Sequence, residues 1–92
     1  MRFEWDDIKA AANLRKHWVS FAEAAEVFDD PNLVESEDAS HSREEARFVV
    51  VGYSARRLLL VVSTEPRRDV IRLISARLPT PSERKLYEGS RR

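Results

Sequence analysis

Two arginines near the end of the chain are well suited to bind an anion. Arg77 ends an apolar run that is typical of a β-strand, and Arg84 lies one turn inside a helix expected to begin after Thr80. The first turn of a helix presents free backbone N–H groups that favour anions, and guanidinium groups grip phosphate with paired donors. Arg77, Arg84 and the helix start could therefore form an oxyanion or phosphate site.

A third arginine, Arg72, lies in the middle of the expected strand over residues 69–77. Strand side chains alternate between the two faces of a sheet, which would place Arg72 and Arg77 on opposite faces. An arginine within an apolar strand is costly unless it finds a partner or a water-filled cleft. Arg72 is therefore either paired with a carboxylate such as Glu45 or Glu65, or placed for function.

Acid–base and metal chemistry have fewer candidates. His17, at the end of an expected helix, could transfer a proton near neutral pH, or it could pack and cap the helix carbonyls. His41 has no ligand motif around it, and the chain has no cysteine and no glycine-rich phosphate loop. Asp29 and Asp30 are expected to end a helix before Pro31 rather than to hold a metal ion. We expect no metal or cofactor site.

An α+β fold must position these candidates. Capping residues and apolar periodicity predict two N-terminal helices and one C-terminal helix, with Ser20 and Glu23 satisfying each other's backbone N–H groups in a capping box. Between them, apolar runs joined by short turns predict an antiparallel sheet of three or four strands. The expected helices cover residues 6–17, 21–28 and 81–88, and the expected strands cover 47–53, 58–64 and 69–77, with a short fourth at 32–36. Helices packed on one sheet define the α+β class.

Length and composition set the outer bounds. With 92 residues, we expect a single domain over residues 1–92. No apolar run approaches the length that spans a membrane. The first residues lack the apolar region of a signal peptide, which favours the cytoplasm.

The net charge of zero conceals an uneven distribution. Residues 1–55 hold six Lys and Arg against twelve Asp and Glu, whereas residues 56–92 hold ten against four. This division favours two opposed surfaces, of which the basic one could meet phosphates. The alternative is that the two segments interleave in space and their charges mix.

Short motifs along nearly the whole chain together resemble the BrnT family of toxins. The matching residues include Phe3-Glu4-Trp5-Asp6, Lys16-His17, Val19-Ser20-Phe21, Val27-Phe28-Asp29-Asp30-Pro31, Thr64-Glu65, Ile71-Arg72, Ile74-Ser75-Ala76-Arg77, Glu83-Arg84 and Tyr87. The sequence departs from the family at two positions. Trp18 replaces the glycine usual after Lys-His, and Ser63 replaces a histidine or aromatic residue.

The resemblance implies a ribonuclease toxin of a type II toxin–antitoxin pair, with a fold similar to that of RelE-type toxins. It also implies a BrnA-like antitoxin that forms a hetero-oligomer with the toxin. Operator DNA would be contacted only through the antitoxin's DNA-binding domain. Toxins of this kind act without a metal ion.

We hypothesise on this basis that the ribose 2′-hydroxyl attacks the adjacent phosphodiester and leaves a 2′,3′-cyclic phosphate. Arg77 and Arg84, with Arg72 behind them, would bind the phosphate and stabilise its developing charge. His17 and Glu45 are the alternative groups for proton transfer.

Further contacts with RNA are expected from Lys16, Arg47 and Tyr87. Either Tyr53 or Tyr87 could stack on a base, and ordinary packing is the alternative for both rings. The rival hypothesis from another class is a non-catalytic RNA- or protein-binding module, in which the arginines contribute affinity alone.

Overall fold

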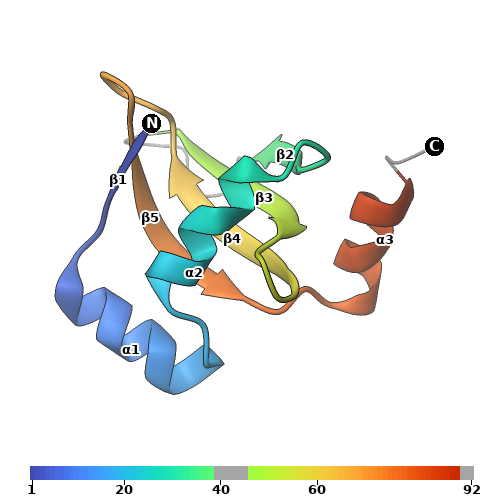
Figure 1. Ribbon diagram of the computed structural model, residues 1–92, viewed down its shortest axis with the longest axis horizontal. Helices are drawn as coiled ribbons and strands as arrows, with labels where there is room; N and C mark the ends of the chain where they lie inside the picture. Colours follow the sequence, from blue (N-terminus) through green and yellow to red (C-terminus); the bar gives the residue numbers. More distant parts are fainter. Residues whose placement is uncertain (39–45, 90–92) are drawn as a thin grey trace.

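The computed structural model describes residues 1–38 and 46–89 and shows an α+β fold (Figure 1). Three α-helices and one short 3₁₀ helix accompany a five-stranded sheet of order β1-β5-β4-β3-β2. In chain order the elements are β1 (Arg2–Glu4), α1 (Asp7–His17), α2 (Phe21–Glu26), η1 (Val27–Asp29), β2 (Val34–Glu37), β3 (Arg47–Tyr53), β4 (Leu58–Thr64), β5 (Val70–Arg77) and α3 (Pro81–Gly89).

The α+β class and the three helices are confirmed, but the predicted strand count and orientation need correction. Strands β2 to β5 are antiparallel neighbours as expected, whereas the additional strand β1 runs parallel to β5. Three residues are too few to show a period-two pattern in the sequence. Strand β1 is defined by its pairing with β5, 66 or more residues away in the chain, rather than by local preference.

The helices α1 and α2 begin where their caps predicted, but the predicted capping box of α2 is incomplete. Asp6 accepts hydrogen bonds from the backbone N–H groups of Ile8 and Lys9, at 2.8 and 3.1 Å. Ser20 likewise accepts from Glu23 N, but Glu23 does not complete the predicted capping box. Its carboxylate instead binds the guanidinium of Arg57 at 2.9 and 3.0 Å, because the β3–β4 turn brings this cation to α2.

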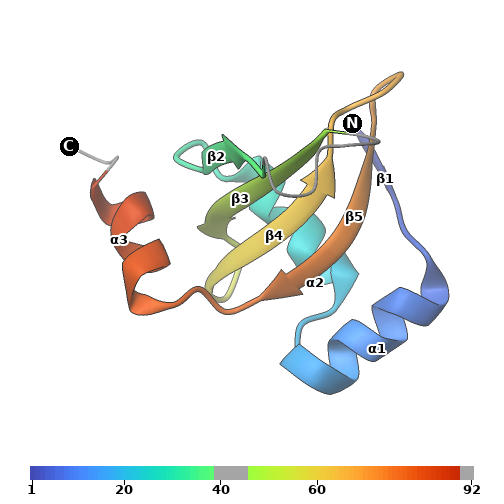
Figure 2. The same ribbon diagram turned by 180° about the vertical axis from the view of Figure 1, so that it is seen from behind.

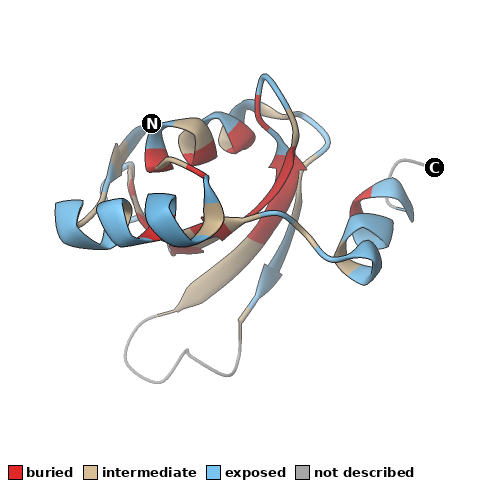
Figure 3. Cartoon of the chain, turned by 90° about the horizontal axis from the view of Figure 1, so that it is seen from below, coloured by how far each residue is buried: buried red, intermediate tan, exposed pale blue. Residues whose placement is uncertain are grey.

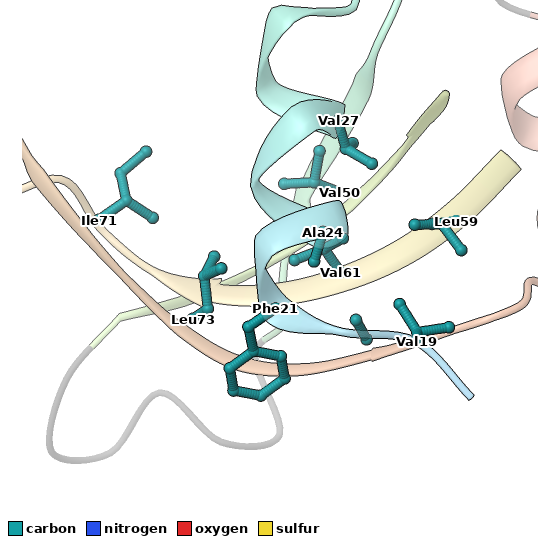
Figure 4. Packing of buried hydrophobic residues seen from close by; sticks show 10 residues of the cluster. Val19, Phe21, Ala24, Val27, Val50, Leu59, Val61, Ile71 and Leu73 are labelled. Atoms are coloured by element: carbon teal, nitrogen blue, oxygen red, sulfur yellow. The ribbon is translucent and has the colours of Figure 1, made fainter. Parts of the chain in front are cut away.

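The main core lies between the sheet and helices α1 and α2. Figure 4 shows side chains of α2 directed at those of β3, β4 and β5. The core residues of this cluster are Val19, Phe21, Ala24, Val27, Val50, Leu59, Val61, Ile71, Leu73 and Ala76. A smaller cluster, formed by Val51, Leu58, Leu60 and Tyr87, lies on the opposite face, where α3 packs. The sheet is thus covered fully on one face and partly on the other.

The side chain of Asn13 fastens α1 to the edge of the sheet. Its amide nitrogen donates to the carbonyls of Val19 and Ala76 at 3.0 and 2.9 Å, and its oxygen accepts from Ala76 N at 3.1 Å. Asn13 is itself buried. Burial is tolerable because these hydrogen bonds satisfy both ends of the amide.

The two oppositely charged segments of the sequence interleave in space. Arg72 pairs with Glu4 and Arg57 pairs with Glu23, so basic residues of the second segment neutralise acidic residues of the first. The expectation of two opposed surfaces, one for each segment, is therefore wrong. A basic surface can form only where a few unpaired cations lie close together. Within the described residues, no helix is long and apolar enough to cross a membrane.

Trp18 ends α1 in a conformation that suits glycine better. Its φ is 60°, in the left-handed region, and its side chain is 79% exposed. A left-handed backbone costs a non-glycine residue about 1 kcal/mol, and this exposed ring recovers little by packing.

Replacing Trp18 with glycine is therefore expected to leave the free energy of unfolding unchanged or raise it by up to about 1 kcal/mol. Trp18→Val, with a β-branched side chain, is expected to lower it by a similar amount. Urea unfolding of both variants measures these changes. A loss of stability in Trp18→Gly as large as that in Trp18→Val would contradict the assignment of strain to this position.

Candidate functional site

The sheet face opposite α1 and α2 is the candidate functional site. Figure 2 shows this face with α3 standing at one side of it, and Figure 3 shows α3 set apart from the helices of the other face. Residues that alternate with the main-core positions must point here. We call this surface the open face; its members on the three central strands include Arg47, Val49, Val62, Thr64, Arg72, Ser75 and Arg77.

A β-bulge in β5 brings Arg72 and Arg77 to the same face. The β4–β5 register passes from Ser63 opposite Leu73 to Val62 opposite Ser75, so Ile74 is an extra residue in the ladder. Strict alternation predicted opposite faces for the two arginines, and that prediction is wrong. The inserted residue reverses the alternation between them, which is a recurrent way for a bulge to redirect a side chain.

One end of the open face carries Arg47 and Arg72 beside Thr64. Arg47 stands opposite Thr64 in the β3–β4 register, and Arg72 N donates to Thr64 Oγ1 at 3.2 Å. Arg72 forms its ion pair with Glu4, at 2.9 Å. Glu65, one of the two partners proposed from the sequence, does not form this pair. Within the described residues, the buried Nε of Arg47 has no hydrogen-bond partner. A water molecule or a ligand that supplies an acceptor can satisfy such an atom.

The other end carries Arg77, Glu83 and Arg84. The Arg77 guanidinium binds both carboxylate oxygens of Glu83, at 2.8 and 2.9 Å, and also donates to Leu78 O. Glu83 completes the predicted capping box with Thr80, whose backbone N–H donates to it at 2.8 Å. The ion pair with Arg77 lowers the pKa of Glu83 to about 2, with help from Thr80.

Arg84 follows on the same side of α3. It lies three residues before Tyr87, the buried residue of the helix, and such positions share one helix face. No ion pair involves Arg84 within the described part of the chain, and its side chain is exposed. Its charge therefore remains available to a ligand of the open face.

Small and apolar side chains separate the two arginine ends. Val49, Val62 and Ser75 form the floor between them and are only half-buried. The four residue-to-residue steps of β4 from Leu60, opposite Arg77, to Thr64, beside Arg72, span about 13 Å. An elongated anion could thus contact both ends at once.

The contacts of Tyr87 hold α3 against the sheet. The Tyr87 hydroxyl donates to Asp30 Oδ2 at 2.7 Å, and the same oxygen accepts from Tyr53 N at 2.8 Å. The rings of Tyr53 and Tyr87 meet edge to face, with centroids 5.4 Å apart. Tyr87 is 3% exposed, whereas Tyr53 is 42% exposed, so Tyr53 has the more accessible ring.

Close packing beside Asp30 requires Gly52. A Cβ atom at this position would lie 2.9 Å from Val27 Cγ1 and 3.3 Å from Asp30 Oδ2. Asp30 was expected only to end a helix, and its position under α3 was missed. Nothing local in the sequence links Asp30 to Tyr87, 57 residues away.

Three predicted site residues lie elsewhere or outside the described residues. Lys16 and His17 are in the last turn of α1, which packs on the other side of the sheet through Asn13 and Ala10. Glu45 falls outside the described residues, as does His41. Within residues 1–38 and 46–89, no three His, Asp or Glu side chains come together as metal ligands.

The Arg77–Glu83 pair makes a pH-dependent contribution to stability. Because the pKa of Glu83 falls from 4.5 to about 2 on folding, this contribution is complete above pH 4.5 and is lost as the pH falls towards 2. Glu83→Gln should therefore lower the free energy of unfolding by about 1 kcal/mol at pH 7, a value kept small by solvent exposure. The difference from the unsubstituted protein should shrink below pH 4.5.

Urea unfolding at several pH values measures this difference. Glu88→Gln is the matched control, because Glu88 lies on the same helix without an ion pair to any described residue. A Glu83→Gln deficit that is the same at pH 3 and pH 7 would contradict the role of the ion pair.

Fold and site together define a small α+β protein that presents arginines and hydroxyl groups on one open sheet face. The family model described as "Ribonuclease toxin, BrnT, of type II toxin-antitoxin system" matches residues 5–83. The chain therefore belongs to the BrnT family of ribonuclease toxins.

A solved structure supports the same fold. The crystal structure of the Brucella abortus ribonuclease toxin BrnT is similar, with a TM-score of 0.65 and 18% sequence identity. The similarity covers 87% of this chain and 97% of that one. Among curated proteins, none matches this chain significantly.

Proposed function

We propose that this ribonuclease toxin cleaves RNA on the open face without a metal ion. One observation carries the proposal: the bulge at Ile74 places Arg72 on the same face as Arg77, about 13 Å apart along the sheet. Arg47 and Arg84 add a second cation at either end. Such an array suits the repeated phosphates of a nucleic acid strand.

The reaction would be an internal transfer at phosphorus. The 2′-oxygen forms a bond to the phosphorus, the bond to the 5′-oxygen breaks, and a 2′,3′-cyclic phosphate and a 5′-hydroxyl result. Negative charge grows on the phosphoryl oxygens, where Arg77 and Arg84 would stabilise it. Arg72, about 13 Å away along the sheet, would support them by binding the neighbouring phosphate. Fixed positions for the phosphate and the 2′-hydroxyl would add to the rate.

Proton transfer requires a group other than Glu83. Glu83 is a poor base, because the pKa of its carboxyl is held at about 2 by Arg77. His17 and Glu45 remain the proposed groups, with Glu45 favoured because α1 carries His17 on the far side of the sheet. Lys16 keeps only a peripheral role in binding RNA for the same reason. Tyr53 replaces the buried Tyr87 as the proposed stacking ring.

The proposed partner is a BrnA-like antitoxin that forms a hetero-oligomer with this chain in the cytoplasm and contacts operator DNA itself. Controlled expression tests the toxin role. The chain alone should arrest growth, and expression with the neighbouring gene's product should restore it. Normal growth at an expression level verified by immunoblot would overturn the proposal, as would arrest that the neighbour does not relieve.

A further inference from the structure

A hollow of about 680 Å³ extends the open face beyond Arg72. Its wall on the sheet side consists of open-face positions of β1, β4 and β5, among them Glu4, Thr64 and Arg72. The β4–β5 turn closes it on another side. Because Thr64 and Arg72 belong to both surfaces, a chain-like ligand on the open face could continue into the hollow.

The hollow is locally basic. Four arginines line it, Arg2, Arg67, Arg68 and Arg72, against two glutamates, Glu4 and Glu65. Glu4 is paired with Arg72. Within the described residues, the other three arginines have no carboxylate oxygen within 4 Å. Positive charge therefore gathers locally at this end of the sheet, although the two halves of the sequence mix elsewhere.

The turn that carries two of these arginines is tightly fixed. Arg67 and Val70 exchange backbone hydrogen bonds of 2.9 Å, which leaves Arg68 and Asp69 as a two-residue hairpin loop. Both have positive φ, 52° and 64°, a conformation that hairpins usually give to Asn-Gly. Asp69 also accepts a 2.9 Å hydrogen bond from Arg2 N. The turn and the N-terminus therefore hold their arginines beside one another.

We propose that this hollow is a second phosphate subsite, which binds the RNA backbone several nucleotides away from the cleaved bond. This inference rests on the proposed function. The ligand is the phosphodiester backbone, since single cations spaced around an open, polar hollow recognise phosphates without reading bases. The unpartnered Nε of Arg47, next to Thr64, lies between the two subsites and adds a donor for the same strand.

Substrate length tests the subsite. The variant Arg2→Ala/Arg68→Gly removes two charges, and glycine suits the positive φ of position 68. Its matched control, Arg15→Ala/Arg56→Ala, removes two exposed arginines from α1 and the β3–β4 turn. Steady-state cleavage would be measured on a fluorogenic RNA of about twelve nucleotides and on one of three.

We expect Arg2→Ala/Arg68→Gly to raise KM for the long RNA about tenfold, with kcat unchanged and no effect on the short RNA. Its KM should also depend less steeply on salt concentration. The control should match the unsubstituted protein on both substrates. An unchanged KM for the long RNA would overturn the subsite, as would equal losses on both substrates.

Failure of the proposed function can be distinguished from failure of the phosphate subsite. If the unsubstituted protein cleaves neither RNA, binding of the long RNA by fluorescence anisotropy still tests the hollow, with the same tenfold loss expected. If RNA binding is unchanged but the neighbouring antitoxin binds the variant more weakly, the hollow is a protein-docking surface and the inference is overturned.

Discussion

Replacing Arg84 with alanine is expected to lower kcat for RNA cleavage by about 100-fold, the usual cost of losing one group that stabilises charge in the transition state. Arg84 is exposed and pairs with no carboxylate among the described residues. It lies three residues before the buried Tyr87, a spacing that puts the two on one face of α3. Alanine favours the helix, so the fold should persist. The measurement is the steady-state kcat for cleavage of a labelled RNA.

Lys85→Ala is the matched control for Arg84→Ala. Lys85 is the next residue of α3, carries the same charge and is exposed. Because it lies two residues before Tyr87, it does not share the helix face of Tyr87. Its replacement should leave the cleavage rate within about twofold, because a screened surface charge contributes little. Equal losses in the two variants would show that general attraction, rather than a placed guanidinium, accounts for the effect.

Replacing Asn13 with leucine is expected to lower the free energy of unfolding by about 3 kcal/mol or more. The side chain of Asn13 makes three hydrogen bonds to the backbone of Val19 and Ala76 in a buried position. Leucine has a similar size but leaves those backbone groups without their partner, and each such group costs about 1–3 kcal/mol. Denaturant unfolding followed by circular dichroism measures the change.

Asn32→Ala controls for the loss of an amide side chain. Asn32 is exposed, and its backbone N–H donates to Asp30 Oδ1 at 2.8 Å. We therefore expect a change of less than about 0.5 kcal/mol. A loss below about 1 kcal/mol in Asn13→Leu would contradict the conclusion that this amide fastens α1 to β5.

Much of the fold was predictable because its signals are local. The carboxylate of Asp6, the hydroxyl of Ser20 and the Thr80–Glu83 box mark helix starts through contacts made within three residues. Apolar, β-branched runs marked β3, β4 and β5. Strand β1 and the Glu23–Arg57 pair were not predictable, because each depends on residues brought together only by the folded chain.

The candidate site shows the same division between local and distant information. Arg77 and Arg84 were predicted together because a short loop joins the strand end to the helix start. The common face of Arg72 and Arg77 was missed, since Ile74 is apolar and suits either side of a sheet. The Tyr87–Asp30 contact that sets the position of α3 left no pattern in the sequence.

The most direct test of the open face as a metal-independent ribonuclease site is cleavage of RNA by the purified protein in excess EDTA, with the product ends identified by mass spectrometry. We predict new fragments that carry a 2′,3′-cyclic phosphate on one side of the cut and a 5′-hydroxyl on the other. Intact RNA that is bound but not cut would contradict the proposal and favour a binding module. Cleavage that requires added Mg²⁺ and leaves 3′-hydroxyl ends would contradict the proposed chemistry.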